Sequence, residues 1–489
     1  MADQTSAPPT RLQSYRAILH STALIGGSSI VVMFFALIRM KIVAILLGPA
    51  GIGLFALFSS IADVAVALAG MGVQQSGVRQ IAQAQGSGDH AKIAGTVRTL
   101  ARISLILGLA GGVGLAVLAV PAALLTFGST EYSLAVAALG AVVLLRILTG
   151  GQTALLQGLR RIGDLTKFNI IAAIASVVVT VPMVFAWGAA AIVPSLIIVA
   201  LVTWLTAQWY ARRVPTPTSV PSASVRGEAG DMLRLGFAFM VSGFLTMGTA
   251  YIIRIIVLHD GGIVAAGLYQ AAWAVAGLYV GVVLQAMGTD FYPRLTAVAT
   301  DNEEVCRLVN EQTHVSLLIA APGVIATITF APLVISAFYS SEFSGAVELL
   351  RWFCLGMMLR VISWPMGFII VAKGWQKTFI AIEVAAAILQ VGVSAIFVPL
   401  IGMDGAGTGF VCLYVWHGLL VYVIVHRSCG FRFSHGNLVL LRLFGPACVL
   451  VFTGSRLLPF WWATAIGCTI CCIAGTLTLK TLHHLYRAH

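Results

Sequence analysis

Apolar runs long enough to cross a lipid bilayer recur along this whole chain, and they constrain its fold more than any other feature. A membrane-spanning helix needs about 20 mostly apolar residues. Hydropathy predicts about 14 such segments. They are centred on residues 18–47, 51–74, 99–127, 133–158, 168–187, 190–211, 234–258, 263–287, 313–337, 346–371, 377–400, 404–426, 438–456 and 459–480. We therefore expect an all-α polytopic membrane protein.

Composition supports this fold class and narrows the function. The 489 residues are 59% hydrophobic and only 9% charged, whereas soluble domains carry about a quarter charged residues. The mean hydropathy is +0.97. The formal net charge of +12 would suit a nucleic acid, an anionic membrane surface or an anionic substrate. The positions of the charges along the chain decide between these three.

The basic residues are distributed unevenly between the two sides of the predicted bundle. With the N-terminus placed in the cytoplasm, most of the 29 Lys and Arg residues fall on the inner side. The outer side keeps Arg39, Lys41 and Arg456. This bias is the positive-inside pattern of membrane proteins, and it accounts for most of the net charge without a nucleic acid. It predicts that both termini are cytoplasmic. The outer connections are short, which leaves no outer catalytic domain.

A polar stretch divides the predicted helices into groups. Residues 212–232 are rich in Pro, Ser and Thr, which is typical of a flexible linker. The linker separates an N-terminal lobe, residues 1–211 with helices 1–6, from a C-terminal lobe, residues 233–430 with helices 7–12. Residues 431–489 then add helices 13 and 14, which have no counterpart in the first lobe.

The two predicted lobes resemble each other in sequence at an offset of about 215 residues. Three matches keep this order: residues 37–55 with 252–269, Met71-Gly72 with Met287-Gly288, and Leu145-Arg146-Ile147 with Leu359-Arg360-Val361. Because each lobe has an even number of spans, the repeats have parallel topology and relate by an axis along the membrane normal. The expected architecture is two six-helix lobes around a central cavity, plus about two extra C-terminal helices.

Arginines inside the predicted spans are the first candidates for a binding site. An ionised residue at the bilayer centre costs at least about 2.5 kcal/mol and tends to face a cavity or a partner. Arg146 and Arg360 lie near the middle of their spans. Arg39 and Arg254 form a second equivalent pair nearer the outer surface, with Lys41 close to the first. Guanidinium groups suit bidentate phosphate contacts, so the pattern predicts phosphate or pyrophosphate binding. The outer three could instead reach the surface or form structural pairs.

Two carboxyl groups and two aromatic side chains complete the candidate site. Asp63 lies about midway along the second span, and Glu383 lies about two turns into the eleventh. Either group could take up and release a proton as its surroundings open and close, or serve as a fixed counter-ion for an arginine. Trp273 and Trp364 are candidates to stack on sugar rings, although such residues more often pack or lie in interface belts.

Several kinds of chemistry lack a motif in this chain. The sequence has no G-x-x-x-x-G-K-[ST] loop, so we expect no ATP hydrolysis. Cys468, Cys471 and Cys472 lie within a span without companion His or acidic residues, which argues against a metal site. We therefore predict a transporter without cofactor or metal, not an enzyme, driven by an ion gradient or by the substrate gradient.

Two patches of sequence resemble a known family. Leu46-Leu-Gly48-Pro-Ala-Gly-Ile-Gly53-Leu, after a long first helix, resembles the opening of Wzx-type O-antigen and enterobacterial-common-antigen translocases. Leu359-Arg360-Val361, Ala372-Lys373 and Ile382-Glu383-Val384 resemble a second stretch of those proteins. They belong to the multidrug/oligosaccharidyl-lipid/polysaccharide exporter superfamily. The resemblance implies a lipid-linked oligosaccharide flippase of the bacterial inner membrane, serving lipopolysaccharide or related polysaccharide biosynthesis.

The resemblance also implies a substrate, a mechanism and partners. The substrate would be undecaprenyl-pyrophosphate-linked oligosaccharide, an O-antigen or related unit, moved from the cytoplasmic to the periplasmic leaflet by alternating access. Arg146 and Arg360, and with them Arg39 and Arg254, would bind the pyrophosphate. Transport would be coupled to protons or another cation, as in an antiporter. A polysaccharide polymerase and a chain-length regulator are the expected protein partners.

Two other functions compete with this one. A multidrug or other lipid exporter of the same superfamily is the nearest, but sites for cationic drugs are usually acidic or aromatic, whereas this interior bears arginines. A membrane glycan polymerase or ligase also handles polyprenyl pyrophosphates with arginines. Such enzymes usually place acid and base groups on sizeable outer loops, which this chain lacks.

Overall fold

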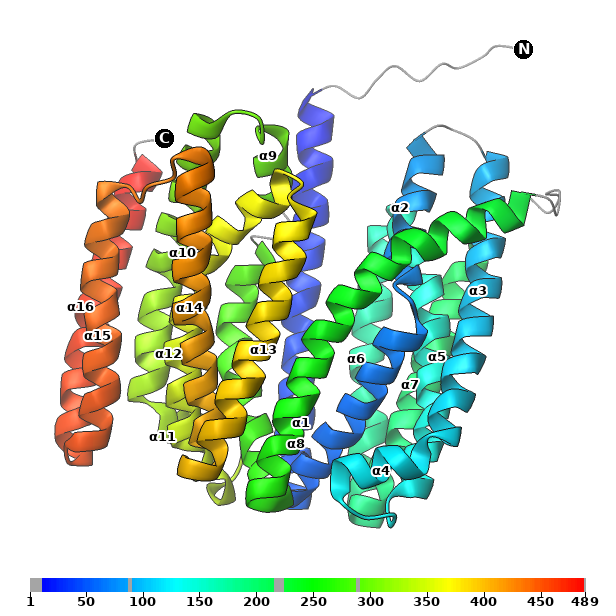
Figure 1. Ribbon diagram of the computed structural model, residues 1–489, viewed down its shortest axis with the longest axis horizontal. Coiled ribbons are helices and arrows are strands. Elements are labelled where there is room, and N and C mark those ends of the chain that lie inside the picture. Colours follow the sequence, from blue (N-terminus) through cyan, green and yellow to red (C-terminus); the bar gives the residue numbers. More distant parts are fainter. Residues whose placement is uncertain (1–10, 87–89, 215–223, 287–290, 488–489) are drawn as a thin grey trace. The chain divides into compact units, whose positions relative to one another are not determined.

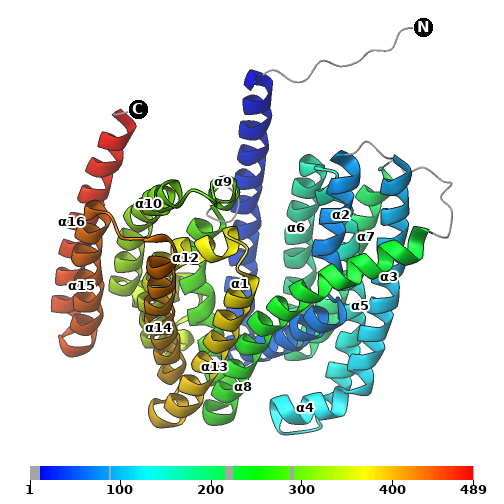
Figure 2. The same cartoon turned by 45° about the horizontal axis from the view of Figure 1, so that its top comes forward.

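The computed structural model describes residues 11–86, 90–214, 224–286 and 291–487. Within these ranges all regular secondary structure is helical, and eleven helical stretches are long and apolar enough to cross a membrane. Figures 1 and 2 show the two groups of long helices. The expected all-α polytopic fold is confirmed.

Long helices follow one another along both halves of the chain. The first half contains α1 (Arg11–Ala69), α2 (Val73–Gly86), α3 (His90–Val117), α4 (Ala119–Phe127), α5 (Ser133–Gly158), α6 (Ile162–Trp187), η1 (Gly188–Ala191) and α7 (Ile192–Arg212). The second half contains α8 (Ser224–Ala286), α9 (Tyr292–Ala297), α10 (Asn302–Thr329), α11 (Ala331–Phe338), η3 (Ser341–Phe343), α12 (Ala346–Ala372), α13 (Gln376–Ile401), α14 (Asp404–Cys429), α15 (His435–Leu457) and α16 (Phe460–Arg487).

Three of the eleven stretches turn back on themselves at a glycine. The backbone of α1 reverses at Gly48, with φ 63° and ψ −169°, and that of α8 reverses at Gly262, with φ 74° and ψ −175°. Gly188, with φ 58°, joins α6 to α7 through η1. Glycine adopts such positive φ angles without a steric penalty. Each of these stretches therefore supplies two of the predicted spans, as the doubling back of α1 in Figure 1 illustrates.

The internal repeat is visible in the helix boundaries. Helices α6 and α13 begin 214 residues apart and end 214 residues apart, and α5 and α12 end at the same interval. The two turning glycines, Gly48 and Gly262, also differ by 214 positions. The succession from α3 to α7 in the first half therefore recurs as α10 to α14 in the second.

The chain divides into two compact units, and the division falls inside two helices. Unit 1 comprises residues 1–47 and 58–247, and unit 2 comprises residues 48–57 and 248–489. Each unit thus contains part of α1 and part of α8. The predicted linker, residues 212–232, is only partly described, because residues 215–223 lie outside the described residues. Helix α8 already begins at Ser224.

Each unit is built around a central helix of the repeat. In unit 1, α5 packs against α3 and α7, and in unit 2, α12 packs against α10 and α14. Helices α15 and α16 pack together and lie against α10 of unit 2. The start of α15 is held by Asn437, whose side-chain amide donates to the backbone carbonyl of Asn310 at 2.9 Å. Its last turn is held by Arg456, which contacts Glu348 at 3.1 Å and Asp404 at 3.2 Å.

Candidate functional site

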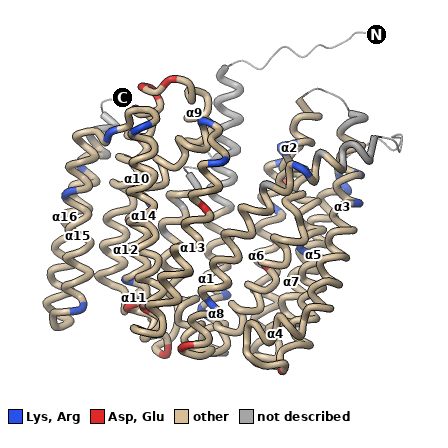
Figure 3. Tube along the Cα trace, viewed as in Figure 1, with Lys and Arg blue, Asp and Glu red and all other residues tan. Residues whose placement is uncertain are grey.

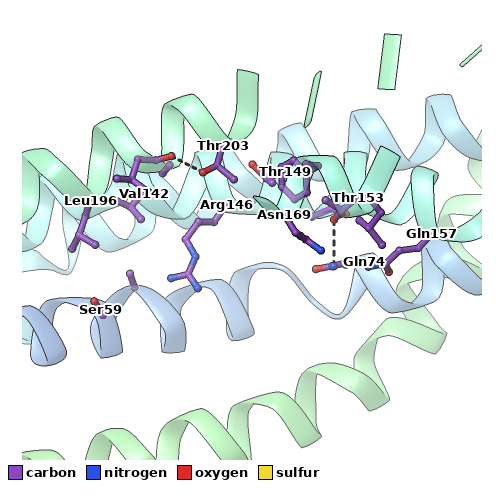
Figure 4. Close-up of a pocket in the computed structure, with 16 residues that line it drawn as sticks. Ser59, Gln74, Val142, Arg146, Thr149, Thr153, Gln157, Asn169, Leu196 and Thr203 are labelled. Carbon is purple, nitrogen blue, oxygen red and sulfur yellow. Dashed lines mark hydrogen bonds between the residues drawn. The ribbon is translucent and has the colours of Figure 1, made fainter. Parts of the chain in front are cut away.

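Arg146 lies on α5 and forms an ion pair inside unit 1. Its Nη1 lies 2.7 Å from Oδ1 of Asp63 on α1, and the two side chains are 42% and 34% exposed. Figure 4 shows the Arg146 side chain extending from α5 toward α1. The sequence allows Asp63 to be either a proton carrier or a counter-ion for an arginine, and its distance from Arg146 is that of a counter-ion. Figure 3 shows how sparse charges are along the spans.

The space beside Arg146 is a cavity of about 450 Å³ with a mixed polar and apolar lining. Its polar lining comes from Ser59, Gln74, Thr149, Thr153, Gln157, Asn169 and Thr203. Gln74 donates from Nε2 to Oγ1 of Thr153 at 3.4 Å, as drawn in Figure 4. A second cavity of about 240 Å³ shares Arg146 and Gln74 and reaches Asp63. A mainly apolar cavity with a few polar side chains beside a charged group has the composition of a small-molecule pocket.

Arg360 lies on α12 of unit 2 in a different environment. Its guanidinium carbon lies 4.6 Å from the centroid of the Trp364 ring and 5.8 Å from that of Tyr414. Its Nε is buried and has no hydrogen-bond partner among the described residues. The aromatic faces attract the cation, but they offer no acceptor for this N–H group. Arg360 is therefore suited to bind an anion.

Two further ionisable side chains, Glu383 of α13 and His417 of α14, lie near Arg360. The His417 ring lies 5.9 Å from that of Tyr414, and its Nδ1 is buried without a hydrogen-bond partner in the described part of the chain. Sequence reasoning missed Tyr414 and His417. A histidine inside an apolar span was the available signal, because ionisable residues at that depth usually serve a function.

The two arginine sites occupy equivalent positions of the repeat but carry different chemistry. Arg146 and Arg360 are 214 residues apart, and the same interval relates Asn169 to Glu383 and Thr203 to His417. The equivalent helices therefore present an amide and a hydroxyl in unit 1, where unit 2 presents a carboxyl group and an imidazole. In unit 1 the carboxylate comes from Asp63, whose equivalent position in unit 2 is a glycine.

The sequence predicts an outer layer of basic residues formed by Arg39, Lys41 and Arg254, and the structure gives a side-chain partner for Arg254. Arg254 donates from Nε and Nη2 to Oε1 of Gln270, at 3.2 and 2.9 Å. Both residues belong to α8, one on each arm of the reversal at Gly262. Arg39 and Lys41 are half-buried on α1. The contact between Arg254 and Gln270 thus joins a cation to a neutral amide across the turn.

The two tryptophans proposed for sugar stacking have different surroundings. Trp273 packs edge-on against Phe353 and Phe410, with ring centroids 5.3 and 5.2 Å apart. These neighbours are buried, so Trp273 belongs to a packed aromatic cluster. Trp364 contacts Arg360 and also meets Phe368 at 5.9 Å. Of the two, Trp364 is the one beside a charged group.

Known proteins match this sequence over much of its length. Residues 42–348 match the family described as polysaccharide biosynthesis protein. The chain belongs to this family. Among its relatives are the lipid III flippases of Escherichia coli K12 and Shigella flexneri. Each is 22% identical over 401 residues, which is 80% of this chain and 94% of the relative.

Solved structures show which fold this chain has. An inward-facing multidrug resistance MATE family transporter of the MOP superfamily aligns with a TM-score of 0.67 and 17% identity, over 83% of this chain and 94% of that one. A MOP superfamily transporter from Pyrococcus furiosus aligns with a TM-score of 0.57 and 17% identity, over 84% and 93%. The chain therefore has the MOP transporter fold.

Proposed function

We propose that this protein is a Wzx-type flippase, which moves a polyprenyl-pyrophosphate-linked oligosaccharide across a bacterial inner membrane by alternating access. Membership of the polysaccharide biosynthesis family and the match to lipid III flippases over 94% of their length support the proposal. The oligosaccharide would be an O-antigen or related unit and would pass from the cytoplasmic to the periplasmic leaflet, with both termini in the cytoplasm. A polymerase and a chain-length regulator would then use it.

Arg360 is the observation that carries the proposal. A guanidinium within a membrane-spanning helix, with a buried Nε that has no partner among the described residues, favours an anionic ligand. A pyrophosphate supplies several acceptor oxygens and a matching charge. The neighbouring Trp364 offers a flat apolar face to the first sugar or to the guanidinium itself.

Arg146 would serve as a weaker anion contact in unit 1. Because Asp63 already pairs with it at 2.7 Å, a pyrophosphate must compete with a carboxylate there. The adjoining cavity is lined by amides and hydroxyls, which suit the hydroxyl groups of an oligosaccharide. A strong contact in one unit and a weaker one in the other would favour release.

A depletion experiment in the native bacterium tests the proposal. When the protein is depleted, a polyprenyl-linked glycan should accumulate in the cytoplasmic leaflet, and its sugars identify the substrate. Arg360→Ala should fail to restore export, and Arg360→Lys should restore it in part, because lysine keeps the charge but loses the fork. Arg307→Ala, which removes an exposed arginine of α10, is the control. Normal export from a well-expressed Arg360→Ala protein would contradict the proposal.

A further inference from the structure

A groove runs between α3 and α7 of unit 1 and shares only Ser104 and Gly151 with the smaller cavity beside Arg146. Both helices pack against α5, yet they make at most marginal contact with each other within the described part of the chain. The space between them is a cavity of about 510 Å³, with α5 as its floor. Its lining includes Leu105 on α3, Leu148 and Gln152 on α5, and Trp204, Gln208 and Arg212 on α7.

The lining of this groove carries one charged residue, three other hydrogen-bonding side chains on α5 and α7, and apolar residues. Arg212 closes the last turn of α7. At about 1.5 Å per residue, Gln208 lies about 6 Å and Trp204 about 12 Å further along the helix. Leu105 and Leu148 belong to the apolar lining. Along α7, the charge of Arg212 is thus followed by the amide of Gln208 and the indole N–H of Trp204, and Leu155 and Val214 add apolar surface near the charged end.

Two buried polar atoms in the groove have no protein partner. Gln152 donates from Nε2 to Oε1 of Gln208, so the two amides are joined across the groove. Oε1 of Gln152, an acceptor, and the indole Nε1 of Trp204, a donor, are both buried and have no hydrogen-bond partner in the described ranges. Buried polar groups are normally satisfied. An indole N–H can only donate, so the groove presents a donor to an acceptor that the protein does not provide.

The equivalent position in unit 2 is filled by the chain itself. Met366, which corresponds to Gln152, is only 1% exposed and belongs to a core cluster that includes Phe431. Tyr422, which corresponds to Gln208, stacks on Phe433 at 5.7 Å. His426 corresponds to Arg212 and contacts the carbonyl oxygen of Phe431 through Nδ1 at 2.9 Å. In unit 2, side chains of the protein therefore fill the site that is an open groove in unit 1.

We propose that the groove of unit 1 binds an anionic glycerophospholipid of the surrounding membrane. The phosphate pairs with Arg212, as lipid headgroups do with basic pockets between membrane helices. An ester carbonyl oxygen, which lies just below the phosphate, accepts from the Trp204 indole N–H. An acyl chain follows Leu105 and Leu148. A polyprenyl phosphate fits less well, because its chain is apolar directly beneath the phosphate. This inference does not rest on the proposed transport function.

Lipid can reach the groove because its rims face outward from unit 1. Leu105 on α3 is 46% exposed, and Leu205, which follows Trp204 on α7, is 51% exposed. Apolar side chains exposed on membrane-spanning helices are the surface that lipid chains cover. Ala101, which lines the groove on α3, is also exposed.

Native mass spectrometry of the full-length, delipidated protein tests this assignment. The probes are dioleoylphosphatidylglycerol, dioleoylphosphatidylcholine and undecaprenyl phosphate. We expect phosphatidylglycerol to bind most tightly. Trp204→Phe keeps the ring but loses the donor, and should weaken binding about tenfold. Arg212→Gln should remove the preference for the anionic lipid. Ala101→Trp, which fills the groove, should abolish binding while leaving the melting temperature within a few degrees.

Two neighbouring residues provide matched controls. Trp209 and Arg213 lie on the same end of α7 but contact each other, with the guanidinium 3.5 Å from the ring centroid, and neither lines the groove. Trp209→Phe and Arg213→Gln should leave lipid binding unchanged. Equal binding to the wild type and to Ala101→Trp would overturn the proposal. So would tighter binding of undecaprenyl phosphate, or equal losses in the test and control variants.

Discussion

At the scale of single residues, two arginines at the same position of a repeat have been given different neighbours. Arg146 is paired with Asp63, and Arg360 lies against Trp364 and Tyr414. The sequence predicts both as equivalent buried cations, because hydropathy and repeat alignment report depth and position along the helix. Hydropathy and repeat alignment do not show which side chains contact each arginine. Those contacts depend on which side chains of α1, α13 and α14 reach the guanidinium group, and helix packing decides this.

The ion pair in unit 1 leads to a prediction for Asp63. Asp63→Asn removes the carboxylate that competes for Arg146, so geranylgeranyl pyrophosphate should bind about fivefold more tightly, the size expected for a partly exposed pair. Calorimetry on the detergent-solubilised protein measures this change. The gain should vanish in Asp63→Asn combined with Arg146→Ala. An Asp63→Asn protein that binds the pyrophosphate no better than wild type would contradict the competition.

We propose that Glu383, rather than Asp63, couples transport to protons. Asp63 is fixed in an ion pair 2.7 Å from Arg146, whereas Glu383 experiences the charge of Arg360 and forms no such ion pair within the described ranges. We expect Glu383→Gln to remove the response of transport to a pH gradient imposed across liposomes, and Asp63→Asn to retain it. Transport by the wild type that ignores the gradient would make proton coupling untenable.

At the scale of helices, hydropathy predicts the spans well because bilayer thickness fixes their length. The turns at Gly48 and Gly262 fall between predicted spans, as expected. Other features depend on tertiary contact. The division into units cuts through α1 and α8, and no local signal marks residues 57 or 247 as boundaries. The proximity of His417 to Arg360 of α12 likewise depends on how the helices pack.

Two equivalent glycines, Gly53 and Gly267, hold the arms of α1 and α8 against each other in unit 2. A Cβ atom at Gly267 would lie 1.8 Å from the carbonyl oxygen of Pro49, and one at Gly53 would lie 2.3 Å from that of Ile263. Backbone contacts this close require glycine. Gly267→Ala should therefore lower the melting temperature and the yield of monodisperse protein.

A control for this substitution lies on the same helix. No described atom outside the helix lies within 4 Å of a Cβ built at Gly277 of α8. Gly277→Ala should leave the melting temperature unchanged or raise it slightly, because alanine lowers the entropy of the unfolded chain. Fluorescence-detected size exclusion after heating measures both variants. Equal melting temperatures for the two would show that the contact at Gly267 is dispensable.

Across the whole molecule, the two copies of the repeat have the same succession of helices but different side chains at equivalent sites. The unit 1 groove between α3 and α7 keeps polar atoms without protein partners among the described residues, whereas the equivalent site of unit 2 is packed by Phe431 and its neighbours. The added helices α15 and α16 lie against α10 of unit 2, and the corresponding helix of unit 1 has no such cover in the described ranges. These differences suit two units that make unequal contacts with substrate and lipid.

Direct observation of lipid-linked oligosaccharide crossing a bilayer tests the central claim. Purified protein is reconstituted into liposomes that carry the native polyprenyl-pyrophosphate-linked glycan, and an impermeant lectin measures the glycan reaching the outer leaflet. We expect wild-type protein to expose the inner pool at a rate far above that of protein-free liposomes. Arg360→Ala, reconstituted at the same density, should fall to the protein-free rate. Wild-type liposomes no faster than protein-free ones, or Arg360→Ala as fast as wild type, would contradict the claim.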